Sequence, residues 1–526
     1  MSGLRVRDSV IAGKGLFTKI RREKGDFICT YDGDRLTHKQ YSRRYKTKSP
    51  TYVLQVNGNH YIDGKKKDEG SYGRYINSCS GTDMTSNCKF CVNPVTKVVS
   101  VKATKDISKN EEILVSYGRS YNVGKKPGDR ICIIGGGLSG LYAAYVLMKR
   151  YKKKNYDITI YERDKEVLGG RIKNVDFAGM RVVAGAGIGR YDSDVLLRKL
   201  CDDILPKDGG ISIYDSKSLY VGGIKRGFNP LDKIKGLIAK SKTDETTAGK
   251  TFKQFAMEIW KQKTYDQFVS YVGETDFEEG DVLDILNDYN FEESFSSEFK
   301  AFGVDWDIFL EALIEKLCRG GVRLKCGKNI ENITKLFEVD GEEYDKVIIA
   351  TPIESTKKLL LRGSPLLKYY DNVGCQSFTR VYAKLEKPLD LKKSRTVIAP
   401  YPFQKIIEFK PCVYMISYSD NKASEFWKSA NDMLLLSQTI EKELVDKKLV
   451  VGGRNKVLSS KLIYWDCGTH YYKPLDQFFG DRDEYLKVVQ NPMPNVYVVG
   501  EAFSRNQGWC EGALESVEAI IGNFLK

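Results

Sequence analysis

A glycine-rich turn between a strand and a helix constrains the fold of this chain more than any other feature. Residues 130–134 form a buried-type strand, Arg-Ile-Cys-Ile-Ile, which runs directly into Gly-Gly-Gly-Leu-Ser-Gly at 135–140. A helical stretch continues to Arg150, and a second strand at 158–161 ends at Glu162. Strand, glycine turn, helix, strand and acid in this order predict a dinucleotide-binding βαβ unit.

Each position of this unit has a physical role. Gly135 permits the tight turn, Gly137 lets backbone N–H groups approach a pyrophosphate, and Gly140 allows close packing of helix on strand. Ser139 belongs to the turn that faces the positive end of the helix toward the phosphates. Glu162 lies 22 residues after Gly140, where a carboxylate binds ribose hydroxyls. A plain glycine turn is the alternative, which the ordered context disfavours.

Composition is typical of a soluble protein with more than one domain. The 526 residues exceed one typical core, and 41% hydrophobic with 29% charged residues is ordinary. No apolar run approaches the ~20 residues that span a bilayer, so no membrane association is expected. Three histidines argue against a metal centre and a Ser-His-Asp triad. Twelve scattered cysteines and no secretory leader predict reduced thiols in a soluble intracellular protein, of the cytoplasm or nucleus (or of a host cell, if viral).

Positive charge is concentrated in the first quarter of the chain. Residues 1–126 hold 25 Lys and Arg against 12 Asp and Glu, a net charge of +13, whereas the remainder carries +2. This asymmetry predicts separate domains with separate partners. Weak nucleic-acid binding by the basic part is one interpretation, and a lysine-rich solubilising face is an equal alternative.

A polar stretch with two glycines and a proline, at 121–129, indicates the domain boundary. Before it, short β-type runs separated by glycine and charged turns predict a small, mostly-β domain. These runs are 27–31, 52–56, 98–101 and 113–117.

The larger region resembles the flavin-containing amine oxidases over residues 130–526. Besides the glycine turn, the resemblance rests on Leu-Gly-Gly-Arg-Ile at 168–172, Val-Ala-Gly-Ala-Gly at 183–187, Val-Ile-Ile-Ala-Thr-Pro at 347–352, Val-Tyr-Val-Val-Gly-Glu-Ala at 496–502 and Gly-Trp-Cys-Glu-Gly-Ala-Leu-Glu-Ser at 508–516. It implies FAD as the cofactor, with NAD as sole cofactor the lesser alternative. It also implies an α/β Rossmann-like FAD-binding domain (about 130–200, 320–372 and 490–526) and an α+β substrate domain (about 201–319 and 373–489).

The same resemblance assigns residues to the flavin. Besides the glycine turn, it implies contacts from Glu162, Arg163, Gly170, Arg171, Gly187, Ile330, Gly500, Glu501 and Ala513. The acid at 501 would bind the ribityl chain, and the last helix would point its positive end at the flavin. Thr469 stands where covalently flavinylated members carry cysteine, so non-covalent FAD is expected.

Three residues are expected at the reacting end of the flavin. Trp509 matches one aromatic wall of the family's substrate cage, and His470 takes the position of the other, usually a tyrosine. An imidazole can form such a wall only while it is neutral. Arg380 matches a lysine that is bonded through water to the flavin. A surface salt bridge is an equal alternative for Arg380.

An acidic stretch lies between these motifs. Residues 274–307 hold twelve acids and one base, Lys300. An acidic rim could steer a cationic amine toward the cavity. A solvated helix face is the more frequent origin of such a run, and we favour it.

The first region resembles the SET-domain lysine methyltransferases over residues 3–121. The segments that carry this resemblance include Gly-Lys-Gly-Leu-Phe at 13–17, Arg-Tyr-Ile-Asn-Ser-Cys at 74–79 and Glu-Glu-Ile-Leu-Val-Ser-Tyr-Gly at 111–118. Lys14, Gly15 and Asn77 would contact S-adenosylmethionine, and Tyr117 would orient the substrate amine. The histidine that usually follows Asn77 is absent, and a binding module without turnover is the alternative.

Together these features predict a multidomain protein with a SET-like domain at 1–122, a linker at 123–129 and a flavin amine oxidase at 130–526. The oxidase would convert a small amine or polyamine to an imine with release of hydrogen peroxide. The competing substrate is methylated lysine on a protein, with the SET-like part as a basic binding platform. If the SET-like domain turns over, its expected substrate is a histone or another basic protein.

Overall fold

The computed structural model divides into two compact units, Met1–Pro127 and Gly128–Lys526. It describes residues 3–11, 13–45, 52–57, 60–65, 72–79, 85–93, 96–115, 129–151, 156–206, 209–220, 228–244, 246–289, 291, 298–333, 337–360, 366–391, 396–430, 432–450, 453–475 and 478–524. Most of the expected linker, with Tyr117 of the first unit, lies outside the described residues.

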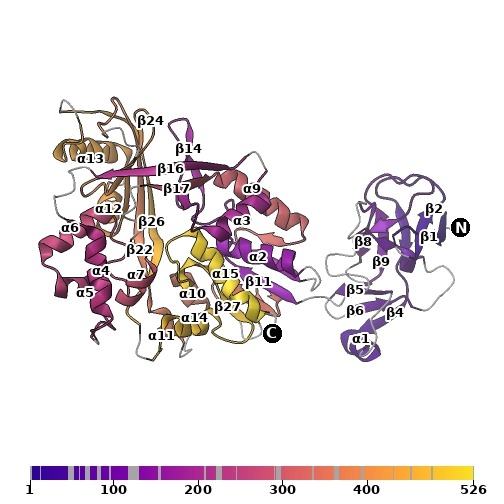
Figure 1. The fold of residues 1–526 in the computed structure, drawn as a ribbon. Coiled ribbons are helices and arrows are strands. Elements are labelled where there is room, and N and C mark those ends of the chain that lie inside the picture. Colours follow the sequence, from indigo (N-terminus) through magenta and orange to yellow (C-terminus); the bar gives the residue numbers. More distant parts are fainter. Residues whose placement is uncertain are drawn as a thin grey trace. The chain divides into compact units, whose positions relative to one another are not determined.

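Short strands in three small sheets build the first unit (Figure 1). They are β1 (Leu4–Asp8), β2 (Lys14–Thr18), β3 (Phe27–Thr30), β4 (Asp34–Thr37), β5 (Val53–Asn57), β6 (His60–Asp63), β7 (Asn77–Ser78), β8 (Cys88–Val92), β9 (Val99–Ala103) and β10 (Leu114–Val115), with helix α1 (His38–Arg44) and the 3₁₀ turn η1 (Gly73–Tyr75). The largest sheet has the order β3-β9-β8-β10-β7. The expected mostly-β architecture of this unit is confirmed.

A parallel pair in that sheet brings two distant motifs together. β10 pairs in parallel with β7, with Leu114 opposite Asn77. Buried Ile76 and Val115 belong to one apolar cluster beside these strands. Residues 74–79 and 111–115 therefore meet in space, although more than thirty residues separate them.

A five-stranded parallel sheet forms the centre of the second unit's dinucleotide-type half. Its order is β18 (Arg323–Lys325), β12 (Asp157–Tyr161), β11 (Arg130–Ile134), β21 (Lys346–Ile349) and β27 (Val496–Val498). All four pairings are parallel. Buried strands covered on both faces are apolar, as β11 is from residue 131 to 134, and the α/β expectation is confirmed.

Alternate residues of these strands enter different cores because successive side chains point to opposite faces. Ile131 and Ile133 pack with α2 (Leu138–Arg150), α3 (Val195–Ile204), α9 (Trp306–Arg319) and α15 (Cys510–Phe524). Cys132 and Ile134 pack toward the other side, with α10 (Ile353–Leu359), α11 (Leu367–Tyr370), α14 (Arg482–Gln490), and the small hairpin of β19 (Glu338–Val339) and β20 (Glu342–Glu343). Figure 1 shows α15 beside α2.

An eight-stranded sheet dominates the other half of the second unit. Its order is β15 (Ile188–Arg190), β17 (Glu298–Val304), β16 (Ile211–Tyr220), β23 (Thr396–Ile398), β24 (Lys405–Lys410), β25 (Val413–Asp420), β22 (Val373–Leu385) and β26 (Val457–Tyr472). The long antiparallel pair of β22 and β26 carries Arg380 and His470. This strand pair therefore supplies the rigid frame for two of the expected active-site residues.

Smaller elements complete the second unit. Helices α12 (Asn421–Lys428) and α13 (Met433–Asp446) contribute to an apolar cluster with strands of the large sheet. Helices α4 (Pro230–Ser241), α5 (Phe252–Ile259), α6 (Gln262–Val272) and α7 (Val282–Asp288) enclose an aromatic cluster of their own. The remaining elements are the hairpin β13 (Asn174–Phe177) and β14 (Met180–Val183), and the 3₁₀ turn η3 (Glu501–Phe503).

Candidate cofactor and active site

The glycine turn after β11 has the geometry that its sequence predicts. Gly135 has φ +112°, and a Cβ there would lie 2.3 Å from the Ala350 carbonyl oxygen. A Cβ on Gly140 would lie 2.0 Å from the Gly135 carbonyl oxygen, so α2 approaches the strand too closely for any other residue. A Cβ on Gly137 would meet nothing within 4 Å. The turn thus leaves open space at the one glycine expected to face a pyrophosphate.

A second glycine turn lies against the first. Gly169 pairs with Gly137 in an isolated parallel bridge, and the Gly169 N–H donates to the Gly136 carbonyl at 2.8 Å. Gly170 has φ +62°, and a Cβ there would have only the Gly137 Cα within 4 Å, at 3.4 Å. Two open glycine backbones therefore flank the same space. Glu162 lies beside it and accepts a hydrogen bond from the Gly136 N–H at 2.8 Å.

A buried charge network connects the Gly-Gly-Arg segment to the C-terminal motif. Arg171 Nη1 donates to Glu501 Oε1 at 2.6 Å and to the Gly468 carbonyl at 2.7 Å. The other side of Glu501 accepts from the Gly508 N–H at 3.1 Å, and His470 Nδ1 lies 2.5 Å from Oε1. Burial opposes ionisation of Glu501, but His470 and Arg171 outweigh it and lower its pKa to about 2.

His470 is fully enclosed by this network. It is 3% exposed, and its Nε2 lies 3.1 Å from Cys467 Sγ. Both ring nitrogens therefore have partners within β26 and η3. Its assignment as a cage wall stays a prediction.

Trp509 lies just before α15 and is half-buried. Its indole Nε1–H donates to Asp194 Oδ2 at 2.7 Å. Two residues on, Glu511 accepts from the Leu196 and Leu197 N–H groups at 2.6 and 2.8 Å. These contacts attach the start of α15 to the start of α3, which fixes the orientation of the indole.

Arg380 is 3% exposed, so the surface salt bridge considered above is wrong. Arg380 points inward from β22, and its guanidinium lies 4.5 Å from the Tyr418 ring centroid. Its Nη2 would lie 3.2 Å from a Cβ on Gly187, and its Nε has no hydrogen-bond partner among the described residues. Arg380 is thus a buried cation beside the Val-Ala-Gly-Ala-Gly segment.

The remaining residues assigned to FAD differ in accessibility. Arg163 is exposed, Ile330 and Gly187 are half-buried, and Ser139 and Ala513 are buried. Gly500 has φ +138°, with nothing within 4 Å of a Cβ built on it. Thr469 Cγ2 lies 3.8 Å from a Cβ built on Gly508. β26 therefore places Thr469 next to the loop that carries Trp509.

One pair of cysteines contradicts the expectation that all are reduced. Cys375 of β22 and Cys467 of β26 form a disulfide, with their Cα atoms 5.4 Å apart. Strand pairing places residue 375 opposite residue 470, and the register is irregular between residues 376 and 378, where β26 brings Cys467 within bonding reach of Cys375. No local spacing signals this pair, because 92 residues separate its members.

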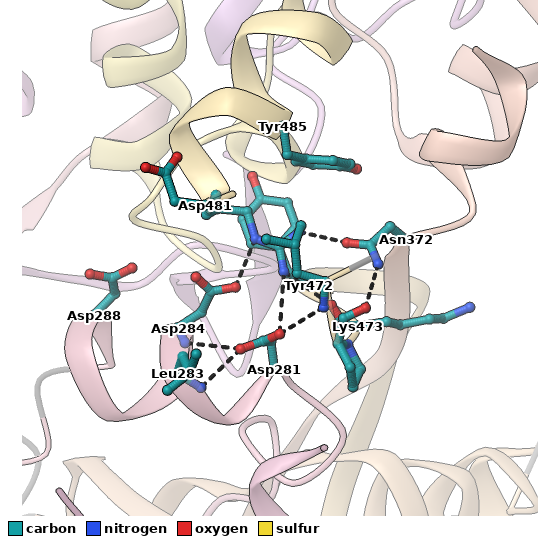
Figure 2. Close-up of polar contacts among 12 residues, drawn as sticks. Asp281, Leu283, Asp284, Asp288, Asn372, Tyr472, Lys473, Asp481 and Tyr485 are labelled. Carbon is teal, nitrogen blue, oxygen red and sulfur yellow. Dashed lines mark hydrogen bonds and ion pairs between the residues drawn. The ribbon is translucent and has the colours of Figure 1, made fainter. Parts of the chain in front are cut away.

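Asp281 and Asp284 of the acidic segment do not lie on a solvated face, whereas Glu279, Asp288, Asp305 and Asp307 are exposed as expected. Asp281 caps α7, and Asp284 accepts from Arg482 Nε at 2.7 Å. Arg482 is 2% exposed, and it also donates to Asn372 Oδ1 at 2.5 Å and to the Lys473 carbonyl at 3.0 Å. Figure 2 shows Asp281 and Asp284, both from the start of α7, and Asn372, from the residue before β22, converging on one point. These acids therefore join α7 to β22, β26 and α14.

In the first unit, a carboxylate that sequence reasoning did not single out connects the expected S-adenosylmethionine residues. Glu112 Oε1 accepts from Asn77 Nδ2 at 2.9 Å, and a Cβ on Gly15 would lie 2.2 Å from the same oxygen. Asn77 Nδ2 also lies 3.4 Å from the Lys14 carbonyl. The structure thus brings Lys14, Gly15 and Asn77 together. The Glu-Glu pair of the closing motif was the available signal for Glu112.

Comparison with protein families identifies both units at the level of domain class. The SET domain model matches residues 13–118, and the model of an NAD(P)-binding Rossmann-like domain matches residues 133–202. The chain therefore carries an N-terminal SET domain followed by a Rossmann-like dinucleotide-binding domain.

Two relatives match the first unit. The chain is 33% identical over 129 residues to the variant-silencing SET domain-containing protein of Plasmodium falciparum (isolate 3D7), a match that covers 23% of this chain and 5% of that protein. It is 29% identical over 130 residues to the histone-lysine N-methyltransferase set-1 of Caenorhabditis elegans, covering 22% and 50%. The chain thus spans half or less of the length of these relatives.

The second unit has its likeness among solved structures. Wild-type putrescine oxidase bound to putrescine superposes with a TM-score of 0.58 at 12% identity, and the match covers 76% of this chain and 99% of that one. The second unit therefore has the fold of an amine oxidase. Among the helices of the described residues, none is long and apolar enough to cross a membrane.

Proposed function

We propose that the second unit is an FAD-dependent amine oxidase acting on a small amine or polyamine. The observation that carries the proposal is the open space at Gly137 and Gly170, flanked by Glu162 and the Arg171–Glu501 pair. Two open glycine backbones at the positive end of α2 suit a pyrophosphate, and two carboxylates suit sugar hydroxyls. The donor set thus fits a dinucleotide such as FAD, and the amine-oxidase fold favours the flavin.

The residues of this chain have separate tasks in such a reaction. Bound FAD would accept a hydride from the carbon beside the substrate nitrogen, yielding an imine and, with oxygen, hydrogen peroxide. Trp509, fixed by Asp194, supplies a rigid apolar wall that positions the amine. Arg380 keeps a positive charge in the interior, which disfavours an ammonium and favours the neutral amine. A protein-bound methyl-lysine is the competing substrate class.

The Gly137→Val variant should lose flavin while keeping its fold. A valine side chain there projects into the open space rather than into protein, so it blocks the cofactor and leaves the apoprotein unstrained. We expect at least about a tenfold lower ratio of flavin absorbance to protein in the purified variant.

Gly236→Val is the matched control, because Gly236 occupies an exposed position of α4 and its Cβ would have nothing within 4 Å. It should keep full flavin content. Acid precipitation of the wild type should release the flavin to the supernatant, since Thr469 replaces the linking cysteine. Equal flavin in both variants, or no flavin in the wild type, contradicts the proposal.

For the SET domain we propose S-adenosylmethionine binding and slow methyl transfer to lysine on a histone or similar basic protein. The contacts that join Lys14, Gly15 and Asn77 through Glu112 support a single cofactor pocket. Tyr117, assigned to orient the amine, lies outside the described residues and stays a prediction, as does weak nucleic-acid binding by this basic unit.

Replacing Asn77 should weaken binding of S-adenosylmethionine. Asn77→Ala removes an amide that orders both Glu112 and the Lys14 carbonyl, and loss of one such hydrogen bond corresponds to about tenfold in the dissociation constant. Calorimetry on the full chain measures the effect. Asn93→Ala, in the turn after β8, should bind like the wild type. No binding by the wild type would favour the binding-module alternative.

A further inference from the structure

Two cysteines, a histidine and a carboxylate form one connected chain of contacts in the second unit. The Cys375–Cys467 disulfide joins β22 to β26. His470 Nε2 lies 3.1 Å from Cys467 Sγ, and His470 Nδ1 lies 2.5 Å from Glu501 Oε1. Both cysteines are half-buried, whereas His470 is buried. The sulfurs are therefore more accessible than the imidazole behind them.

The contacts of Glu501 determine which ring nitrogen carries the proton. Arg171 Nη1 and the Gly508 N–H both donate to the Glu501 carboxylate, so Glu501 is an acceptor and the hydrogen of its short contact with His470 belongs to the imidazole. The hydrogen therefore lies on Nδ1. This leaves the Nε2 lone pair directed at the sulfur, and the Ile353 N–H, 3.4 Å away, also points to Nε2 as acceptor. A base with a fixed tautomer thus faces Cys467.

The fully buried cysteines of the described residues have no neighbouring base comparable to His470. Burial raises the thiol pKa of Cys29, Cys88 and Cys201 to about 12 each, which makes them unreactive. Around Cys467, by contrast, the charged or titratable groups are His470 from its own strand, Cys375 from β22, Glu501 from η3 and the guanidinium of Arg171. Asp466 directly precedes Cys467 in β26, and Lys428 of α12 binds its carboxylate at 3.2 Å.

We propose that Cys375 and Cys467 form a redox-active dithiol–disulfide centre that exchanges with low-molecular-weight thiols of the glutathione class, with His470 as its base. The external thiol loses its proton to solvent, and its thiolate attacks Cys375 Sγ. The S–S bond breaks, and Cys467 leaves as a thiolate, which is reprotonated through His470 Nε2. A second thiolate attacks the outer sulfur of the mixed disulfide, Cys375 leaves and takes up the second proton, and the two external thiols are released as their disulfide. In the reverse direction His470 Nε2 accepts the proton of the Cys467 thiol and so acts as the base. Two thiols are oxidised and one protein disulfide is reduced.

This activity does not depend on FAD or on amine oxidation. The exchange uses only side chains of β22, β26 and η3 and the external thiol. Its failure and a failure of the proposed oxidase function are therefore distinguishable, because the measurements below follow thiols and need no flavin.

The first experiment equilibrates the full-length protein in buffers with graded ratios of glutathione to glutathione disulfide. Remaining thiols are trapped with iodoacetamide in denaturant, and peptides are identified by mass. We expect the linked 375–467 peptide pair to convert to two alkylated peptides within this range of ratios. A pair that stays fully oxidised, or fully reduced, at every ratio overturns the proposal.

The second experiment tests the role of His470 through the rate of alkylation of the reduced protein at pH 6.5. Exposed Cys318 is the internal reference in the same tube. Cys467 should react faster than Cys318, and His470→Gln should slow it about tenfold without changing Cys318. An unchanged ratio overturns the assignment of the base. Zinc retained at one atom per chain, with both thiols protected until a chelator is added, would instead make this cluster a metal site.

Discussion

Replacing Arg482 with methionine should destabilise the second unit by about 3–5 kcal/mol. Methionine fills similar space but leaves Asn372 Oδ1 and the Lys473 carbonyl without their Arg482 donor, and Asp284 with Arg505 alone. Burial already raises the pKa of Asp284 to about 6, so its carboxylate would lose its closest compensating charge. An uncompensated buried charge is among the costliest single changes a folded protein can carry.

Tryptophan fluorescence during denaturant unfolding measures this effect selectively. All five tryptophans lie beyond residue 250, so the signal reports on the second unit alone. Arg505→Met is the matched control, because Arg505 binds the same Asp284 at 2.9 Å but has a 41% exposed side chain. We expect a loss below about 1 kcal/mol for this control. Equal losses in both variants would show that burial does not separate the two arginines.

Trp509→Ala should reduce amine oxidation about 100-fold while flavin content stays near that of the wild type. The indole is a rigid wall whose orientation depends on one hydrogen bond to Asp194, and small errors in substrate position cost about two orders of magnitude in rate. Steady-state peroxide release per bound flavin is the measurement. Normalising to flavin separates a positioning defect from loss of cofactor.

Trp509→Phe separates the two contributions of the indole. Phenylalanine keeps an aromatic wall but cannot donate to Asp194. If the wall positions the substrate, Phe should retain far more activity than Ala. If the two variants lose activity equally, the hydrogen bond that attaches α15 to α3 is the important contact, and the cage assignment is wrong.

Local sequence was sufficient to predict the parts of this protein that depend on short-range chemistry. Gly135 and Gly140 have their expected roles because tight turns and close packing depend on the residue itself, whereas the role of Gly137 toward a pyrophosphate stays a prediction. β11 was predictable because a strand buried on both faces is apolar throughout. The parallel pairing that joins residues 74–79 to 111–115 was not predicted, since no local pattern encodes pairing across such a distance.

Other features depend on tertiary pairing and have no local signal. Cys375 and Cys467 meet only because β22 pairs with β26 through an irregular register, and neither flanking sequence differs from that of an ordinary cysteine. The acids at 281 and 284 resembled a solvated run because their partner, Arg482, lies about two hundred residues later. The burial of Arg380 likewise follows from which face of a long strand turns inward.

The central parallel sheet has a consequence for synthesis on the ribosome. Its middle strand, β11, is made early, but β27 and the helix α15 that covers β11's apolar face come from the last thirty or so described residues. At about 5–20 residues per second, the sheet stays incomplete for tens of seconds. During that interval its edge and one hydrophobic face are open to other nascent chains. The strands that the structure describes in the SET domain lie within the first 115 residues, so this domain can fold long before its larger neighbour, which has the greater need of a chaperone.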